Sequence, residues 1–158
     1  MPFDIFAKIG DIKGESQDDK HKGEIEVLSY SWGGKGTVIH EAGGGAVGSK
    51  ATFQDLQIVH HIDKATPKLL DSCASGVHIK EATITHRKAG KGQQEFLVIK
   101  MNDVIITGVT HGGDLQGSSE TVTMAFAKVD LAYSPMKSDG SLDVAQHFKY
   151  DLESNKVL

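Results

Sequence analysis

Cysteine, proline and aromatic residues are scarce in this sequence. It has one cysteine, Cys73, three prolines and 6% aromatic residues among 158. A single cysteine excludes an internal disulfide and the zinc sites built from several thiolates, so nothing demands an oxidising compartment. No apolar run approaches the ~20 residues of a membrane-spanning helix. We therefore expect no stable membrane insertion.

Charge of one sign is not concentrated anywhere in the chain. The 17 basic and 21 acidic residues are mixed along its length and give a formal net charge of −4. Without a basic block to neutralise phosphates, nucleic acid is not expected as a partner. The first residues, MPFDIF, place an acid at position 4 and no basic segment before an apolar stretch, so we expect no signal peptide. Export would then need another route from the cytoplasm.

Glycine, in contrast, is abundant. Its 18 residues are about 11% of the chain against a typical ~7%, which favours many strands joined by glycine turns. A length of 158 residues is enough for one domain with its own core. No linker or internal repeat divides the sequence. We predict a mainly β fold and a single domain over residues 1–158.

The first third of the chain reads as strands around two irregular segments. Apolar and polar residues alternate over 3–9, which predicts a strand, and residues 10–23 form a polar loop. Residues 24–33 alternate again, but the bulky positions shift, as a bulge would cause. After the shift, Ser29 and Ser31 occupy one face and the other face packs through Leu28, Tyr30 and Trp32.

Glycine dominates the next stretch, "GGKGTVIHEAGGGAVGSK", which predicts an extended glycine-rich loop over residues 33–50, with a short strand at 37–40. A strand follows at 51–60. Helical spacing then predicts one α-helix over about 63–75. Its N-cap is Thr66 or, one turn earlier, Asp63, with Pro67 in the first turn and Gly76 just beyond the end.

The rest of the chain predicts an antiparallel meander. Strands are expected at 77–87, 94–101 and 104–111, with a tight turn at Asn102 and Asp103. Residues 120–134 form a long strand whose apolar parity switches midway, and a last strand runs through "HFKYDL".

Motifs for catalysis or cofactor binding are weak. GGGAVG at 43–48 matches a dinucleotide fingerprint as a string but precedes a strand, and Ser49 precedes Lys50, the reverse of a phosphate-binding loop. Neighbouring residues on a strand point to opposite faces, so His60 and His61 do not share a metal ion. Cys73 lies on the apolar side of the helix. We expect no catalytic residue, no cofactor and no metal site.

Two other functions remain open at this point. Tyr30 and Trp32 on one strand face would suit a monomeric sugar- or metabolite-binding barrel. The eight histidines would suit a small metal-dependent enzyme.

Several long segments resemble one family. They are "FDIFAKIGDIKGESQDDKHKGEIEVLSYSWG", "DLQIVHHIDKATPKLLDSCASGVHIKEATITHRKAG", "EFLVIKMNDVIITGV", "ETVTMAFAKVDLAYSPMKSDG" and "YDLESNK". Together they resemble Hcp, the haemolysin-coregulated protein family of the bacterial type VI secretion system, over essentially the whole chain. The main local departure is Met136, where the family more often has glutamine; it affects only local turn or surface contacts.

The resemblance implies a small antiparallel β-barrel of two sheets with one flanking helix. It implies a homo-hexameric ring, and rings that stack into a tube. The tube assembles in the cytoplasm and is then secreted, with a spike protein, a contractile sheath and small effector proteins as partners. It implies that Ser29 and Ser31 face the lumen and contact effectors. The residues expected at the ring or stacking interface are Gly34, Thr37, His40, Gly43, Gly44, Gly45 and Val47.

Overall fold

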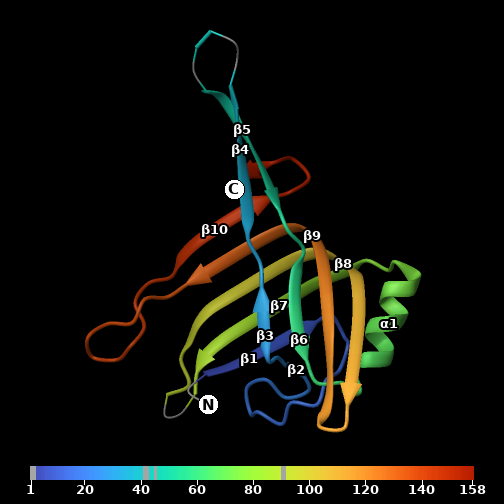
Figure 1. The fold of residues 1–158 in the computed structure, drawn as a ribbon. Coiled ribbons are helices and arrows are strands. Elements are labelled where there is room, and N and C mark those ends of the chain that lie inside the picture. Colours follow the sequence, from blue (N-terminus) through green and yellow to red (C-terminus); the bar gives the residue numbers. More distant parts are fainter. Residues whose placement is uncertain (1–2, 41–42, 45, 90–91) are drawn as a thin grey trace.

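The computed structural model describes residues 3–40, 43–44, 46–89 and 92–158, and shows a body of antiparallel strands from which one hairpin projects (Figure 1). The elements are β1 (Phe3–Ile9), β2 (Ile25–Glu26), β3 (Ser29–Ser31), β4 (Gly34–His40), β5 (Ala46–Phe53), β6 (Leu56–His60), α1 (Thr66–Ser75), β7 (Ile79–Lys88), β8 (Glu95–Asp114), β9 (Gly117–Tyr133), β10 (Gln146–Asp151) and β11 (Lys156–Val157). The mainly β class, with one helix in the described residues, is confirmed.

The strands form two sheets, but the larger one does not close. Its order of paired neighbours is β11-β10-β9-β8-β7-β1-β2, and a branch runs from β9 through β6 to β3. Within the described residues no ladder joins β3 to β1, so the strands of the expected barrel stop short of closure. The chain pairs with β1 in β2, crosses at Val27 and Leu28, and then pairs with β6 in β3. An open seam therefore remains between β1 and β3.

The core lies on the inner faces of these strands and under α1. Its fully buried apolar side chains come from six strands and the helix: Ile9, Ile25, Leu56, Ile58, Leu69, Ile84, Ile99, Met101, Ile106 and Met124. The expected parity switch in the long strand β9 is confirmed. Phe126 is buried, Lys128 is exposed, and Val129 is buried again. β9 can therefore contribute to the core along both of its halves.

The helix begins later than the earliest expected cap. Asp63 Oδ1 accepts a hydrogen bond from the Ala65 amide over 2.8 Å, so residues 63–65 form a turn before α1. Ala65 is the N-cap residue and makes no side-chain cap, whereas Pro67 lies in the first turn as expected. Gly76 ends the helix in the left-handed region, with φ of 64°. Ten residues make α1 too short to cross a membrane, and no other helix occurs in the described ranges.

The turn expected at Asn102 and Asp103 is also wrong, because β8 continues through it. Asp103 has φ of 58°, a left-handed conformation that aspartate tolerates better than most residues. The ladder to β9 resumes on either side, with Asn102 opposite Lys128 and Val104 opposite Phe126. The reversal instead lies beyond Asp114, where β8 turns into β9.

The segment 33–50 was predicted to be an extended glycine-rich loop, but most of it forms a two-stranded hairpin. β4 and β5 pair in register from Gly34 opposite Phe53 to Ile39 opposite Gly48, with one irregularity before His40. The short strand expected at 37–40 is part of β4. The β-branched run Thr37, Val38 and Ile39 favours extended backbone despite the surrounding glycines. We call the hairpin Gly34–Phe53 the arm.

An aromatic cluster fixes the root of the arm to the body. The rings of Trp32 and Phe53 stack with centroids 5.5 Å apart, and Phe53 lies 4.8 Å from the ring of Tyr150 on β10. A Cβ on Gly34 would lie 2.6 Å from the Phe53 ring, so only glycine allows this close approach. The arm therefore leaves the body from a packed base.

Three polar side chains are buried where β6, β9 and α1 meet. His60 and Glu120 are both 0% exposed, and His60 Nε2 donates to Glu120 Oε1 over 2.9 Å. Thr66 donates to the same oxygen over 3.3 Å. The second oxygen of Glu120 lies 3.5 Å from His111 Nε2, and His60 Nδ1 lies 3.6 Å from Asp63. We call His60, Thr66 and Glu120 the polar knot.

Removing both partners of the polar knot should cost less than the sum of the losses from removing each one alone. We expect His60→Leu and Glu120→Leu each to lower the free energy of unfolding by roughly 2–4 kcal/mol, because each leaves a buried polar partner unsatisfied. The double variant should lose clearly less than the sum of the two. Urea denaturation followed by Trp32 fluorescence measures all three.

The exposed pair of His147 and Asp130, 2.8 Å apart, is the control. Its removal by His147→Ala should cost less than about 1 kcal/mol. Strictly additive losses for His60→Leu and Glu120→Leu would contradict the coupling.

Candidate functional site

The two serines expected to line a lumen lie on β3. Ser29 and Ser31 have exposed side chains, and Tyr30 between them is half-buried against the core. The face exchange expected from a bulge instead coincides with a change of partner, because β2 pairs with β1 and β3 pairs with β6. Leu28 does not join the packed face as expected and is 53% exposed, because the chain crosses from β1 to β6 there.

Two rows of aligned residues continue the face of these serines across β3, β6, β9 and β8. The rows are Ser29, Val59, Thr121, Thr110 and Ser31, Gln57, Thr123, Gly108. None of the eight is buried and none is charged. Alternate residues of a strand face opposite sides of a sheet, so the intervening row, which includes Ile58 and Val122, faces the core. We call the eight residues the hydroxyl face.

Hydrogen bonds hold one margin of the hydroxyl face. Thr107 donates to Asp55 over 2.7 Å, and its hydroxyl also lies 2.9 Å from that of Thr123. The carboxylate of Asp55 is thereby held beside the face. Hydroxyl and amide groups can bind water or polar surfaces. No side chain in either row can deprotonate a nucleophile or hold a metal ion by itself.

The residues expected at a ring or stacking interface gather on the arm. Gly34, Thr37 and His40 lie on β4, Val47 lies on β5, and Gly43 and Gly44 lie between the strands. Gly45 falls outside the described residues. The arm points away from the body (Figure 1), so its outer positions lie apart from β3, whereas Gly34 at its root is only three residues from Ser31.

The features behind the alternative functions are used in packing. Tyr30 is half-buried with its hydroxyl 3.2 Å from His86 Nδ1, and Trp32 is half-buried against Phe53. Neither ring is an open platform for a sugar. His60 is buried at the end of β6, whereas His61, the next residue and already outside the strand, is exposed. In the part of the chain that the structure describes, no group of three or more His, Cys, Asp or Glu residues could hold a metal ion.

Comparison with known proteins decides the family. The family model described as "Type VI secretion system effector, Hcp" matches residues 6–133. The protein hcp1 of Pseudomonas aeruginosa is 44% identical over 146 residues, which is 90% of each chain. This chain belongs to the Hcp family. It is therefore a tube protein of type VI secretion.

Solved structures of Hcp proteins have the same fold. The crystal structure of Hcp1 from Salmonella typhimurium superimposes with a TM-score of 0.80 at 38% identity and covers 100% of both chains. A type VI secretion system effector from Yersinia pestis gives a TM-score of 0.75 at 38% identity, over 94% of this chain and 99% of that one.

Four threonine and glutamine positions of the hydroxyl face were missed by the sequence analysis of this Hcp protein. Thr121 and Thr123 alternate with buried residues of β9, and Gln57 alternates with buried residues of β6. This alternation is visible in the sequence and could have placed all three on a polar strand face. Thr110 follows a break in register between Ile106 and Gly108, which the sequence does not reveal. Only strand pairing places any of them beside Ser31.

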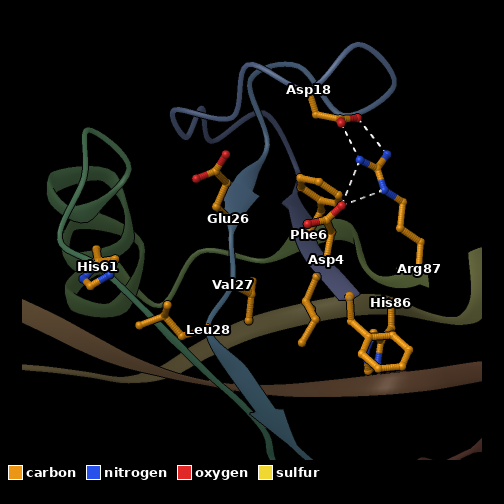
Figure 2. A pocket seen from close by; sticks show the side chains of 11 residues that line it. Asp4, Phe6, Asp18, Glu26, Val27, Leu28, His61, His86 and Arg87 are labelled. Carbon is orange, nitrogen blue, oxygen red and sulfur yellow. Dashed lines mark hydrogen bonds and ion pairs between the residues drawn. The ribbon is translucent and has the colours of Figure 1, made fainter. Parts of the chain in front are cut away.

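A second polar cluster, also missed, explains the charged loop 10–23. Arg87 on β7 is 2% exposed and donates to Asp4 on β1 and to Asp18 in the loop (Figure 2). Its guanidinium carbon lies 4.8 Å from the centroid of the Phe6 ring, and His21 stacks on that ring at 4.4 Å. The loop is thus pinned across β1 and β7. We call these five residues the Arg87 cluster.

Electrostatics make the Asp18 contact sensitive to acid. The hydrogen bond from Arg87 lowers the pKa of Asp18 from 3.8 to about 2. A carboxylate whose pKa is lower in the folded state stabilises the fold above its unfolded pKa, and this contribution disappears as the pH falls through the folded pKa. The relevant window therefore runs from about pH 4 down to about pH 2.

Asp18→Asn should lower the free energy of unfolding at pH 7 by about 1 kcal/mol, since solvent screens part of the pairing. The difference from the unmodified Hcp protein should shrink between about pH 4 and pH 2, where the native carboxylate also becomes neutral. Urea denaturation at a series of pH values measures it. Asp19→Asn, at the exposed neighbouring carboxylate, is the control and should have little effect at any pH. An Asp18→Asn deficit that persists unchanged at pH 2 would argue against this account.

Proposed function

We propose that residues 1–158 act as one Hcp domain that assembles into homo-hexameric rings, and that the rings stack into a hollow tube. The tube forms in the cytoplasm, carries small effector proteins in its lumen, and is secreted with a spike protein at its tip when a contractile sheath drives it out. The role is structural, with no catalytic step. The observation that supports this most is the hydroxyl face.

The hydroxyl face suits the wall of a water-filled channel. Its side chains are small or uncharged, so they remain hydrated without attracting or repelling cargo of one charge sign. The opposite side of the same four strands packs the core, so the face cannot turn inward without burying its hydroxyls. The strands are therefore fixed with a polar surface outward. A ring that turned this surface toward its axis would have a uniform lining.

The edges of the four strands suit a ring of copies. β3 forms one edge, and the other is the part of β8 beyond Val104, where the described ladder with β7 ends. Sheet edges carry unpaired backbone groups that favour contact with another strand. If the β8 edge of one copy lies beside the β3 edge of the next, the hydroxyl faces join. Such head-to-tail contacts close into a ring when the rotation between copies divides a full turn.

The first expectation concerns mass. Native mass spectrometry at micromolar concentration should give six times the chain mass of 17.0 kDa, and electron microscopy should show rings with an open centre. A protein that remains monomeric from low to high micromolar concentration would contradict the proposed assembly. Rings of another copy number would contradict only the hexamer.

The second expectation concerns cargo. Ser31→Arg places a long cation on the hydroxyl face and should leave ring mass unchanged while reducing the amount of effector that co-purifies. Ser154→Arg, in the exposed turn after β10, makes the same change away from this face and should retain cargo normally. Equal cargo in the two variants would oppose a lumenal role for Ser31.

A further inference from the structure

The seam left open in the larger sheet forms a groove beside β1. The β2 side of β1 is covered only as far as Ile5, whose carbonyl accepts a hydrogen bond from the Val27 amide over 2.9 Å. In the described part of the chain, no strand pairs with this edge farther toward Phe3. The groove has a volume of about 780 Å³, within the range of ~300–1,000 Å³ that is typical of small-molecule sites. We call it the seam groove.

Apolar side chains form much of the wall of the seam groove. Because the groove follows a strand edge, side chains from both faces of β1 reach it, Phe3 and Ile5 from one face and Asp4 from the other. The opposite wall is the chain crossing from Glu26 to Leu28 (Figure 2). Phe3 is 45% exposed and Leu28 is 53% exposed. These two side chains therefore offer apolar surface to a ligand without a change in the core.

The ring of Phe3 is held in place by two other rings. Its centroid lies 5.4 Å from that of His86 and 5.8 Å from that of Phe96, both in edge-on contact. The face of an aromatic ring attracts a cation that lies within ~6 Å of its centroid. The other phenylalanine of the groove, Phe6, already has Arg87 and His21 against its ring. Phe3 is therefore the phenylalanine that remains available to a cation from outside.

Negative charge is in excess along the seam groove. Its charged lining residues are Asp4, Asp18 and Glu26 against the single cation Arg87, so three carboxylates and one guanidinium leave a formal charge of −2. Arg87 is already held by Asp4 and Asp18. Glu26 is exposed, so its carboxylate can bind a cation that enters from solvent. The groove thus has both a charge and an apolar wall to offer one ligand.

Two histidines of the lining suit the same kind of ligand. Burial lowers the pKa of His86, whose Nδ1 lies 3.2 Å from the Tyr30 hydroxyl, so this ring adds no positive charge at neutral pH. His61 donates from Nδ1 to the Ser118 carbonyl over 2.9 Å. In its neutral form, the other nitrogen of His61 can then accept a hydrogen bond from an ammonium group.

The chemistry of the seam groove selects among classes of ligand. Its formal charge repels anions. A metal ion has no suitable set of protein ligands, because the described residues contain no group of three or more His, Cys, Asp or Glu side chains that could hold one. A purely apolar molecule would remove water from the carboxylates without replacing its hydrogen bonds. An organic cation with an apolar group suits both the wall and the charge.

We propose that the seam groove binds a small organic cation in which an apolar group is joined to an ammonium group. The ammonium group lies between the carboxylates of Glu26 and Asp4, and the apolar group packs against Phe3 and Leu28. This site is separate from the hydroxyl face and goes beyond the structural role proposed above. Each chain holds one such molecule whether or not the tube carries an effector.

Three matched probes test the class of ligand. They are phenethylammonium, phenethyl alcohol and hydrocinnamate, which share a phenyl group and differ in charge. Isothermal titration calorimetry should give one site per chain for phenethylammonium. Its affinity should be about tenfold higher than that of phenethyl alcohol, because a hydrogen bond to a charged group contributes more than a neutral one. Hydrocinnamate should not bind, and ethylammonium, which lacks the phenyl group, should bind about tenfold more weakly than phenethylammonium.

Variants of the wall locate the site. Glu26→Gln should weaken phenethylammonium binding about tenfold and leave phenethyl alcohol unchanged, because it removes only the charge. Leu28→Ser should weaken both ligands about fivefold, because it removes apolar contact. Glu153→Gln, at an exposed carboxylate in the turn after β10, makes the same charge change elsewhere and should bind all probes normally. Urea denaturation followed by Trp32 fluorescence checks that each variant is folded.

Three results would overturn the inference. One is the absence of saturable phenethylammonium binding at millimolar concentration. Another is equal affinity for phenethylammonium and phenethyl alcohol, which would leave the carboxylates without a role. The third is an equal loss in Glu26→Gln and Glu153→Gln, which would indicate attraction to the net charge of the whole protein. None of these results bears on the proposed tube, which the native mass tests separately.

Discussion

Strand β9 is the constraint on which the rest of this fold depends. It pairs with β8 along nearly all of its 17 residues, with β6 through its first half and with β10 through its second. The first half carries the hydroxyl face, and the second supports the aromatic root of the arm through β10. Because apolar parity switches after Phe126, one strand fills the core at both of these places. The hydroxyl face and the root of the arm are thereby fixed relative to each other.

Burial of polar groups defines the positions of two segments that hydrophobic contact alone would leave loosely specified. The polar knot holds the start of α1 against β6 and β9 through Thr66, which donates to Glu120. The Arg87 cluster holds the loop 10–23 across β1 and β7. An apolar core tolerates sliding more readily than a network in which each donor needs a particular acceptor. The loop that appears in the sequence as a solvated charge cluster is therefore held in one position against β1 and β7.

The proposed role of this Hcp protein depends on its surfaces. The hydroxyl face and the sheet edges at β3 and β8 belong to the larger sheet, whose ladder does not close, whereas the arm is a two-stranded sheet of its own. A closed barrel would have joined β1 to β3 and left no open seam between them. The open seam and the projecting arm give one chain two different surfaces, which is what the proposed head-to-tail assembly requires.

The sequence by itself determined the mainly β class, the strand at residues 3–9, the helix with its Pro67 start and Gly76 end, and the parity switch in β9. These depend on local periodicity and on backbone preferences of single residues, which a sequence shows directly. Its long segments also indicated the Hcp family. It placed Ser29 and Ser31 on a polar strand face for the same reason.

Only the tertiary structure decided the remainder. Alternation cannot tell which strand pairs with which, so it gave neither the rows that join Ser31 to Thr123 nor the failure of β1 to pair with β3. Asp103 was expected in a turn because its left-handed conformation is common there, yet long-range pairing with β9 keeps β8 unbroken through it. The glycines of the arm were expected in a loop, but cross-strand pairing overrides their weak strand preference. Residues far apart in the sequence, such as Asp18 and Arg87, meet only after the strands are in register, and register is a property of the whole sheet.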